Sequence, residues 1–356
     1  MTVTLADVAA RAGVSSATVS RVLNGNYPVA GSTRERVLRA VEELEYVVNG
    51  QARGLAAATS DLVGVLVNDI ADPFFGILAS AAQTEIARGP REGVAAGGGK
   101  LAVVCNTGGC PEAELTYLTL LQRQRAAGVI LTGGTAERTG HTRAVTAKLA
   151  RLTADGTRVV LCGRPPLTVD GGATTTTLAF DNRGGAQRLT EHLLSLGHRH
   201  IGYITGPDDR TTTRHRLEGH GAALTAHGLT ADAARLTAGG DYDRRAGYAA
   251  ARELLDRAPE LTAIVAANDT AALGVCAALR ERGLRVPQDV SVAGFDDLPF
   301  SADAAPALTT VRLPLHEAGA WAGRLVMDRE SAPPGGVATV AAELVPRAST
   351  AAPGAS

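Results

Sequence analysis

The sequence predicts an α/β protein with a small all-α domain at its N-terminus, and three features point to this arrangement. Residues 1–60 contain short amphipathic stretches and many turn-forming residues but no convincing strand. From Leu62 onward, short apolar runs alternate with helical stretches of about 10–15 residues, which is typical of βαβ units and parallel sheets. This pattern continues for about 290 residues, more than one sheet usually takes, so we expect two α/β lobes.

The elements of the core follow from this alternation. The expected strands are the apolar runs at residues 62–67, 101–105, 128–131, 158–162, 201–205, 263–267 and 290–294. The expected helices between them cover residues 74–88, 112–125, 184–196, 216–227, 244–257 and 270–282. Residues 331–336 form a Pro/Gly linker, and one last strand is expected at about 339–345.

Composition limits the classes of protein that remain. The chain has 356 residues, 45% of them hydrophobic and 20% charged, so it can bury sizeable cores and is not a disordered chain. Its formal net charge is −1, so any nucleic-acid site must be local. Four scattered cysteines and a polar, helical start predict a cytoplasmic protein with reduced thiols. No apolar run approaches the ~18 residues that a membrane span needs, so no membrane partner is expected.

The N-terminal residues predict a helix-turn-helix. Thr4 and Asp7 form an N-terminal capping pattern, and Gly13 ends the first helix. Ser15 can cap a second helix. A third helix is expected to start at Ser32, with Glu35 in the capping-box position. Two helices joined by a short Gly-containing turn are the arrangement that places a recognition helix in a DNA groove.

The charge and the exposed residues of this domain favour DNA binding. Residues 1–41 contain five arginines against two carboxylates, a formal excess of +3. The second helix is expected to expose Ser16, Ala17, Ser20 and Arg21. Small residues let a helix enter the major groove, and an arginine can pair with guanine through two hydrogen bonds. The alternative on this pattern alone is a three-helix protein-interaction module.

These residues carry a family resemblance. The stretch 3–24 (VTLADVAARAGVSSATVSRVLN) resembles the N-terminal signature of the LacI/GalR family of transcription regulators, as do 33–37, 44–46 and 49–55. The resemblance implies that Ser16, Ala17 and Arg21 read bases and that Ala52 and Leu55 enter the minor groove. An apolar wedge such as leucine unstacks a base step and kinks the duplex. The implied phosphate contacts are Thr18, Ser20, Asn24, Thr33, Tyr46 and Asn49, with packing against the third helix as the alternative for Tyr46.

The segment around Leu55 would be a hinge that becomes helical on operator DNA. It departs from the family pattern, because Val48 replaces a common proline and both Gly50 and Gly54 lower helix propensity by ~1 kcal/mol each relative to alanine. We therefore expect this hinge to depend strongly on contacts with DNA and with a second protomer.

The rest of the chain, to about residue 349, resembles the effector-binding core of the same family, which it shares with periplasmic sugar-binding proteins. The motifs lie at 69–75, 181–185, 192–201, 216–219, 267–269, 286–291, 294–297 and 308–310. The implied fold has two α/β lobes crossed by three strands, with the ligand in the cleft. The implied effector contacts are Phe74, Phe75, Arg216, Tyr242, Asn268 and Asp296, with Arg210 and Thr212 as weaker candidates.

The residues themselves agree with a cleft at the strand ends. Asp69 and Asp72, Asn268 and Asp269, and Asp296 and Asp297 directly follow apolar runs. In open α/β sheets, ligands bind beyond the carboxyl ends of the strands. Carboxylates, amides, arginine and aromatic rings are the groups that bind a polyhydroxylated ligand.

Several of these residues have a structural alternative. Phe74 suits the core or a dimer contact equally well, and we favour Asp181 and Asp269 as helix caps. His192, His198 and His200 suit a structural role better than a metal site, because no carboxylate or cysteine joins them at ligand spacing. We therefore expect no metal and no cofactor.

Three segments depart from the family pattern. Gly163 and Arg164 follow a strand where the family commonly has an acid, and residues 208–215 (DDRTTTRH) are unusually polar. Residues 89–100 form a Gly-rich insertion that ends in GGGK. This insertion is not a phosphate-binding loop, because Val94 and Leu101 occupy positions that require glycine and Ser/Thr.

The expected organisation has four parts: a helix-turn-helix domain at 1–47, a hinge at 48–60, an effector-binding core at 61–349 and a tail at 350–356. Lobe 1 would cover about 61–164 and 296–325, and lobe 2 about 176–292 and 332–347. The expected function is a dimeric, sequence-specific regulator, in the first instance a repressor. It would bind a pseudo-palindromic operator on double-stranded DNA and respond to a carbohydrate-like effector.

Two other functions compete with this one. A solute-binding protein of a transporter would share the two-lobed core, but it requires export, and this chain starts with a DNA-binding domain. An enzyme is disfavoured because no G-x-S-x-G motif is present and because Cys105 and Cys110 form a lone pair.

Overall fold

The computed structural model describes residues 3–24, 28–46, 60–88, 99–167, 175–229 and 236–354. The chain divides into two compact units, Met1–Ser60 and Asp61–Ser356. The expected hinge, apart from Ser60, and most of the Gly-rich insertion lie outside the described residues. None of the helices in the described ranges is long and apolar enough to cross a membrane.

In its described residues, the first unit contains the short helices α1 (Leu5–Ala12), α2 (Ser16–Asn24) and α3 (Gly31–Glu43) around a small apolar core. The Thr4 and Asp7 capping box forms as expected, and Gly13 ends α1 in the left-handed region with a φ of 65°. The Ser15 hydroxyl accepts from the Thr18 amide at 3.2 Å, which confirms its role as a cap. The capping box expected at Ser32 was wrong, because α3 already begins at Gly31 and its N-cap residue, Ala30, has no hydroxyl or carboxylate to offer.

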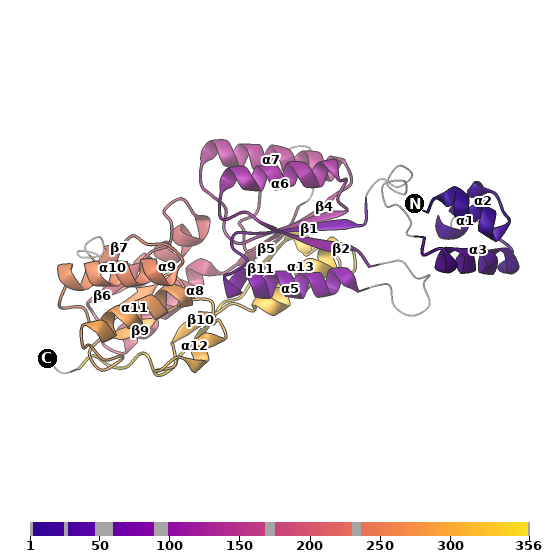
Figure 1. The fold of residues 1–356 in the computed structure, drawn as a ribbon. Helices are drawn as coiled ribbons and strands as arrows, with labels where there is room; N and C mark the ends of the chain where they lie inside the picture. Colours follow the sequence, from indigo (N-terminus) through magenta and orange to yellow (C-terminus); the bar gives the residue numbers. More distant parts are fainter. Residues whose placement is uncertain are drawn as a thin grey trace. The chain divides into compact units, whose positions relative to one another are not determined.

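The first lobe of the second unit has a six-stranded, all-parallel sheet in the order β11-β5-β4-β3-β1-β2. Its strands are β1 (Leu62–Val67), β2 (Leu101–Asn106), β3 (Gly128–Thr132), β4 (Arg158–Cys162), β5 (Thr176–Phe180) and β11 (Val337–Val340). Figure 1 shows α5 (Pro73–Ala87) and α13 (Leu315–Val326) on one face, and α6 (Pro111–Arg123) and α7 (Thr139–Ala154) on the other. Because helices cover both faces, the central strands are continuous apolar runs.

The second lobe has a four-stranded parallel sheet in the order β7-β6-β8-β9. Its strands are β6 (Ile201–Ile204), β7 (Thr237–Ala238), β8 (Ala263–Ala266) and β9 (Ser291–Ala293). Helices α8 (Asn182–Ser195) and α9 (Thr211–Ala226) pack together, as do α10 (Arg244–Arg257) and α11 (Asp269–Glu281). Alternate residues of β8 face two different apolar clusters, because successive side chains of a strand point to opposite faces.

The chain crosses between the lobes three times, as the family resemblance implied (Figure 1). It passes from β5 into α8, from β9 to α13, and from β11 into β12 (Glu343–Val345). The second crossing contains the short helix α12 (Phe300–Asp303) and the strand β10 (Thr310–Arg312), which pairs with β12 in antiparallel fashion. A single 3₁₀ turn, η1 (Pro334–Gly336), precedes β11.

The structure corrects three expectations about the core. Strands β5 and β11, which we placed in lobe 2, belong to the sheet of lobe 1, because β5 pairs with β4 and β11 pairs with β5. The single strand expected at about 339–345 is in fact two strands. The first, β11, pairs with β5 in lobe 1, and the second, β12, pairs with β10. The core also extends past residue 349, since the Ala351 carbonyl lies 2.8 Å from His198 Nε2 and the Thr350 hydroxyl lies 3.1 Å from His192 Nε2.

Candidate functional sites: the interlobe pocket and the helix-turn-helix

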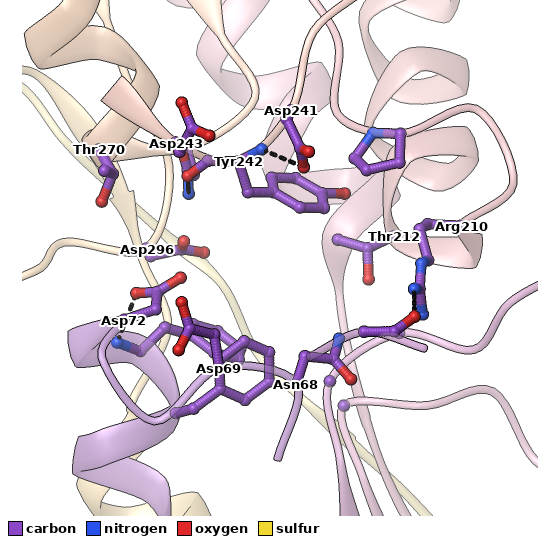
Figure 2. Close-up of a pocket in the computed structure, with 18 of the residues that line it drawn as sticks. Asn68, Asp69, Asp72, Arg210, Thr212, Asp241, Tyr242, Asp243, Thr270 and Asp296 are labelled. Atoms are coloured by element: carbon purple, nitrogen blue, oxygen red, sulfur yellow. Dashed lines mark hydrogen bonds between the residues drawn. The ribbon is translucent and has the colours of Figure 1, made fainter. Parts of the chain in front are cut away.

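A cavity of about 480 Å³ lies between the two lobes, where the carboxyl ends of their strands face each other. Loops that follow β1 to β5 line it from one side, and loops that follow β6 to β9 line it from the other. Figure 2 shows the labelled polar side chains around this space. All six implied effector residues line this one cavity, and so do Arg210 and Thr212. Six residues that are up to 222 positions apart in the sequence (74 to 296) therefore meet at one place.

Arg216 on α9 is the most firmly held polar side chain of the pocket. Its Nη2 donates to Asp296 Oδ1 at 2.7 Å, its Nε to Asn182 Oδ1 at 2.9 Å and its Nη1 to the Ala267 carbonyl at 2.5 Å. The guanidinium also lies over the Phe295 ring, 3.7 Å from its centroid. Because acceptors from three segments fix the same planar group, Arg216 presents a rigid surface to the cavity.

Asp296 is buried next to this arginine, with only 3% of its surface exposed. Burial raises the pKa of its carboxyl to about 7, and the neighbouring Arg216 charge opposes that increase. Its backbone has a φ of 107°, a conformation that costs energy for a residue with a side chain. This costly conformation aims the carboxyl at the cavity and at Arg216.

Aromatic rings form the apolar wall of the pocket. Phe74 and Phe75 meet edge to face with centroids 4.9 Å apart, and Phe180 lies 6.2 Å from Phe74. All three rings also belong to the largest apolar core cluster. Phe74 is therefore a core residue, as one interpretation of the sequence expected, and it also lines the cavity. Gly133 has a φ of 71° and leaves room for the Phe75 ring, which a Cβ at this position would overlap.

Tyr242 and Asn268 complete the side of the pocket that belongs to lobe 2. The Tyr242 hydroxyl is 2.7 Å from Thr213 Oγ1, and the Tyr242 carbonyl accepts from Asn268 Nδ2 at 3.0 Å. Asn268 Oδ1 accepts from the Ala271 amide at 2.8 Å, so Asn268 caps α11. Its amide therefore has a structural role as well as a place in the cavity wall.

The two aspartates that we favoured as helix caps differ in outcome. Asp181 caps α8 by accepting from the Gly184 amide at 2.9 Å, as expected. Asp269 is not a cap, because Asn268 holds that position. The Asp269 carboxylate instead accepts from the Leu298 amide and the Ser301 hydroxyl, both at 2.8 Å, and thereby ties α11 to the second crossing.

Beside the pocket, a loop of lobe 1 (residues 135–138) contacts a segment of lobe 2 (residues 209–214). We call these two segments together the interlobe latch. The Glu137 amide donates to the Asp209 carbonyl at 2.6 Å and the Thr211 amide to the Thr135 carbonyl at 3.0 Å, which makes an antiparallel bridge between the lobes. Arg214 pairs with Glu137 at 2.8 Å, and Arg138 pairs with Asp209 at 2.9 Å. The unusual polarity of residues 208–215 is explained by these contacts.

Two other side chains that the sequence singled out, those of Arg164 and His198, do not line the cavity, although Gly163 does. Arg164, only 1% exposed, donates to both oxygens of Glu114 at 2.9 and 2.7 Å and holds the pKa of that carboxyl well below its usual range. His198 lies between the Thr262 hydroxyl and the Ala351 carbonyl, so it joins lobe 2 to the C-terminal segment. Within the described ranges, no group of three metal-ligating side chains comes together.

The helix-turn-helix presents part of the implied DNA surface. Ser16, Ala17 and Arg21 are exposed on α2, with Ala17 and Arg21 one turn apart, while Thr18 and Ser20 are half-buried. Thr33 is half-buried in the first turn of α3, and Tyr46 packs against the apolar core of this unit. Packing of Tyr46 is thus confirmed, and its phosphate contact stays a prediction. Asn49, Ala52, Leu55 and the side chain of Asn24 lie outside the described residues.

A helix-turn-helix joined in one chain to a two-lobed core with an interlobe cavity defines a class: ligand-regulated DNA-binding proteins. Residues 4–49 match the model of bacterial regulatory proteins of the lacI family, and residues 190–350 match that of a periplasmic binding protein-like domain.

Similar proteins support the same class over the whole chain. The transcriptional regulator GalR of Escherichia coli is 34% identical over 325 residues, which cover 91% of this chain and 88% of GalR. The regulator MalR of Streptomyces coelicolor is 36% identical over 363 residues, which cover 99% and 98% of the two chains. The crystal structure of the Lac repressor dimer bound to operator and an anti-inducer is 28% identical, with a TM-score of 0.78 and coverage of 99% and 100%. The chain belongs to the LacI family of transcriptional regulators.

Proposed function

We propose that this regulator is a repressor that binds a pseudo-palindromic operator as a homodimer in the cytoplasm. A small carbohydrate-like effector in the interlobe pocket would control its affinity for DNA. The observation that carries this proposal is the presence in one chain of an exposed α2 surface and of a cavity at which all six implied effector residues meet. The proposal assigns the chain a binding role and no catalytic step.

Solved relatives support the choice of partners. One is the Lac repressor dimer on its operator, and another is the regulator CelR in complex with cellobiose, which is 32% identical with a TM-score of 0.67. In the present chain, Arg216 donors and the Asp296 carboxylate would bind hydroxyl groups, and the Phe74 and Phe75 rings would cover the apolar face of a sugar.

On DNA, α2 would lie in the major groove, with Ser16, Ala17 and Arg21 facing the bases. Thr18, Ser20, Asn24, Thr33, Tyr46 and Asn49 would contact phosphates, and Ala52 and Leu55 would enter the minor groove. Phosphate contacts fix the position of the protein on the duplex, while base contacts select the sequence.

Effector binding would act through the lobes. A ligand that contacts both lobes favours one relative arrangement of them, and this bias would change the spacing of the two hinges at residues 49–55 in the dimer. A ligand shifts this equilibrium only by its difference in affinity for the two states.

The test is selection of bound duplexes from a randomised library by the full-length protein at one stated salt concentration. We expect a pseudo-palindrome with a central step suited to kinking. Arg21→Ala should relax the preference at one position of each half-site and cost about 1–3 kcal/mol in affinity. Arg151→Ala, on the exposed surface of α7, is the matched control and should leave the selected sequence unchanged. Sequence-blind binding by the unchanged protein would overturn the proposal.

A further inference from the structure

The charged residues of the pocket do not balance. Five aspartates line the cavity against two arginines, namely Asp69, Asp72, Asp241, Asp243 and Asp296 against Arg210 and Arg216. Arg216 is already paired with Asp296. Arg210 donates to the Gly109 carbonyl of the other lobe, and its Nε is 3.7 Å from Asp209. The other four carboxylates at the cavity therefore form no ion pair with an arginine or lysine among the residues that the structure describes.

Each of these four carboxylates accepts a local hydrogen bond on one oxygen, and its second oxygen has no hydrogen-bond partner among the described residues. Oδ1 of Asp69 accepts from the Ala71 amide at 3.0 Å, and Oδ1 of Asp72 accepts from the Phe74 amide at 2.9 Å. Oδ1 of Asp241 accepts from the Tyr242 amide at 2.9 Å, and Oδ1 of Asp243 accepts from the Ala246 amide at 2.7 Å. A neutral asparagine satisfies such an amide as well as an aspartate does. These local bonds therefore do not explain why four negative charges surround one cavity.

Two polar atoms that belong to deeply buried residues support a ligand site in this cavity. Asp296 is 3% exposed and Asn182 is 4% exposed, and both line the cavity. Arg216 occupies Asp296 Oδ1 and Asn182 Oδ1. Asp296 Oδ2 and Asn182 Nδ2 have no protein partner in the described part of the chain. Because Arg216 holds both side chains, an acceptor and a donor lie in the wall of the cavity that the Phe74 and Phe75 rings also line.

Figure 2 shows Asp69 and Asp72 on one side of this space and Asp241 and Asp243 on the side of Tyr242. Burial and the neighbouring Asp69 charge raise the pKa of Asp72, although the bond from the Phe74 amide and the Arg216 charge act in the opposite direction. The like charges in this part of the cavity therefore repel one another when the site holds no cation.

We propose that the effector carries a positive charge. It would be a hydroxylated ring with a primary ammonium group, and an amino sugar is the simplest molecule of this class. The ammonium group would lie between Asp69 and Asp72, and hydroxyl groups would meet Asp296 Oδ2 and Asn182 Nδ2. This inference rests on the proposed function of the pocket and adds the charge of its ligand.

The test compares ligands in which an ammonium group replaces a hydroxyl group. Calorimetric titrations of the full-length protein use glucosamine against glucose, and the β-1,4 dimer of glucosamine against cellobiose, at about pH 6.5 so that the amines are protonated. We expect the cationic member of at least one pair to bind about tenfold or more tightly at about 20 mM salt. The difference should shrink at about 500 mM salt, because screening weakens exposed ion pairs. N-acetylation, which removes the charge, should abolish the preference.

Variants locate the effect. The double change Asp69→Asn and Asp72→Asn keeps the local hydrogen bonds but removes two charges, and it should reduce the preference at least fivefold. Without ligand it should also raise the melting temperature, because two like charges no longer repel. Asp303→Asn, on exposed α12 away from the cavity, is the matched control and should change neither property.

The outcomes separate this inference from the proposed function. If no amino sugar binds more tightly than its neutral partner, or if the preference survives in the double variant, the inference is wrong. If a neutral sugar then binds and shifts operator affinity, the proposed function still stands. If the library selection yields no operator, the proposed function fails regardless of the charge preference.

Discussion

Arg216 and Asp296 are buried charges that depend on each other. Each is at most 3% exposed, and burial already raises the pKa of the Asp296 carboxyl to about 7. Removing one member of such a pair leaves a buried charge without compensation, which typically costs 3–5 kcal/mol, about the scale of a domain's whole stability. The ion pair that we propose as part of the effector site therefore also stabilises the second lobe.

We predict that Arg216→Ala destabilises the protein by about 3 kcal/mol at about pH 8. The double variant Arg216→Ala with Asp296→Asn should recover part of this loss, because the remaining side chain is neutral. An acid with a raised pKa binds its proton more strongly in the folded state, so stability falls as pH rises toward that pKa. The penalty of the single variant should therefore be smaller at about pH 5.

Urea unfolding at both pH values checks this prediction. Equal losses for the single and double variants at about pH 8 would show that the Asp296 charge contributes nothing. The Asp296→Asn variant alone provides the reference for the loss of the ion pair itself.

At the scale of helices and strands, the sequence predicted best those strands that are buried on both faces of the sheet. The bounds of β1 and β4 agree with the expected runs, because their apolar residues are continuous. Strand β5 was missed because it begins with two threonines, one of which, Thr177, is fully buried. Helix α7 was missed because only Val145, Leu149 and Leu152 form its buried face. Short range patterns do not reveal which polar residues a neighbouring element will bury.

Helices α8 and α9 approach each other at Gly219, and this contact gives a prediction with an internal control. A Cβ at Gly219 would overlap the Arg183 carbonyl, whereas a Cβ at Gly221 meets nothing within 4 Å. Gly219→Ala should therefore destabilise the second lobe by about 1–3 kcal/mol through overpacking. Gly221→Ala should stabilise it by up to about 1 kcal/mol, because alanine has the higher helix propensity. Thermal unfolding of both variants measures these changes in stability. Equal changes for the two variants would contradict the close approach of α8 and α9 at Gly219.

The interlobe latch gives a second prediction at this scale. Gly134 lies next to the latch, and a Cβ there would overlap the Thr212 side chain of the other lobe. Gly134→Val should therefore hold the lobes apart, increase the radius of gyration in solution scattering and weaken effector binding. Gly140→Val is the control, because a Cβ at Gly140 meets nothing within 4 Å. Unchanged scattering and affinity for Gly134→Val would show that the latch does not constrain the lobes.

At the scale of the whole molecule, the family resemblance predicted the parts of the pocket better than the local pattern did. All six implied effector residues line the cavity. Asn182, Asp241 and Asp243 were not predicted as pocket residues. The strand that positions the two aspartates, β7, is only two residues long, so the sequence gives no apolar run to mark its carboxyl end. Such a site is assembled by tertiary contacts and not by local propensity.

In the proposed function, the helix-turn-helix and the pocket are two coupled sites of one regulator. Coupling between two binding sites is reciprocal, so an effector that changes operator affinity must itself be bound with a correspondingly changed affinity when operator is present. A typical coupling free energy of about 1–3 kcal/mol corresponds to about 5–150-fold in affinity. The hinge that would transmit it, residues 49–55, lies outside the described part of the chain.

The most direct measurement is therefore a pair of titrations on the full-length protein. Operator affinity is measured with and without a pocket ligand, and the affinity of that ligand is measured with and without operator. We expect the same factor, within about 5–150-fold, in both experiments. A ligand that binds the pocket with an affinity independent of operator, and leaves operator affinity unchanged, would contradict the account.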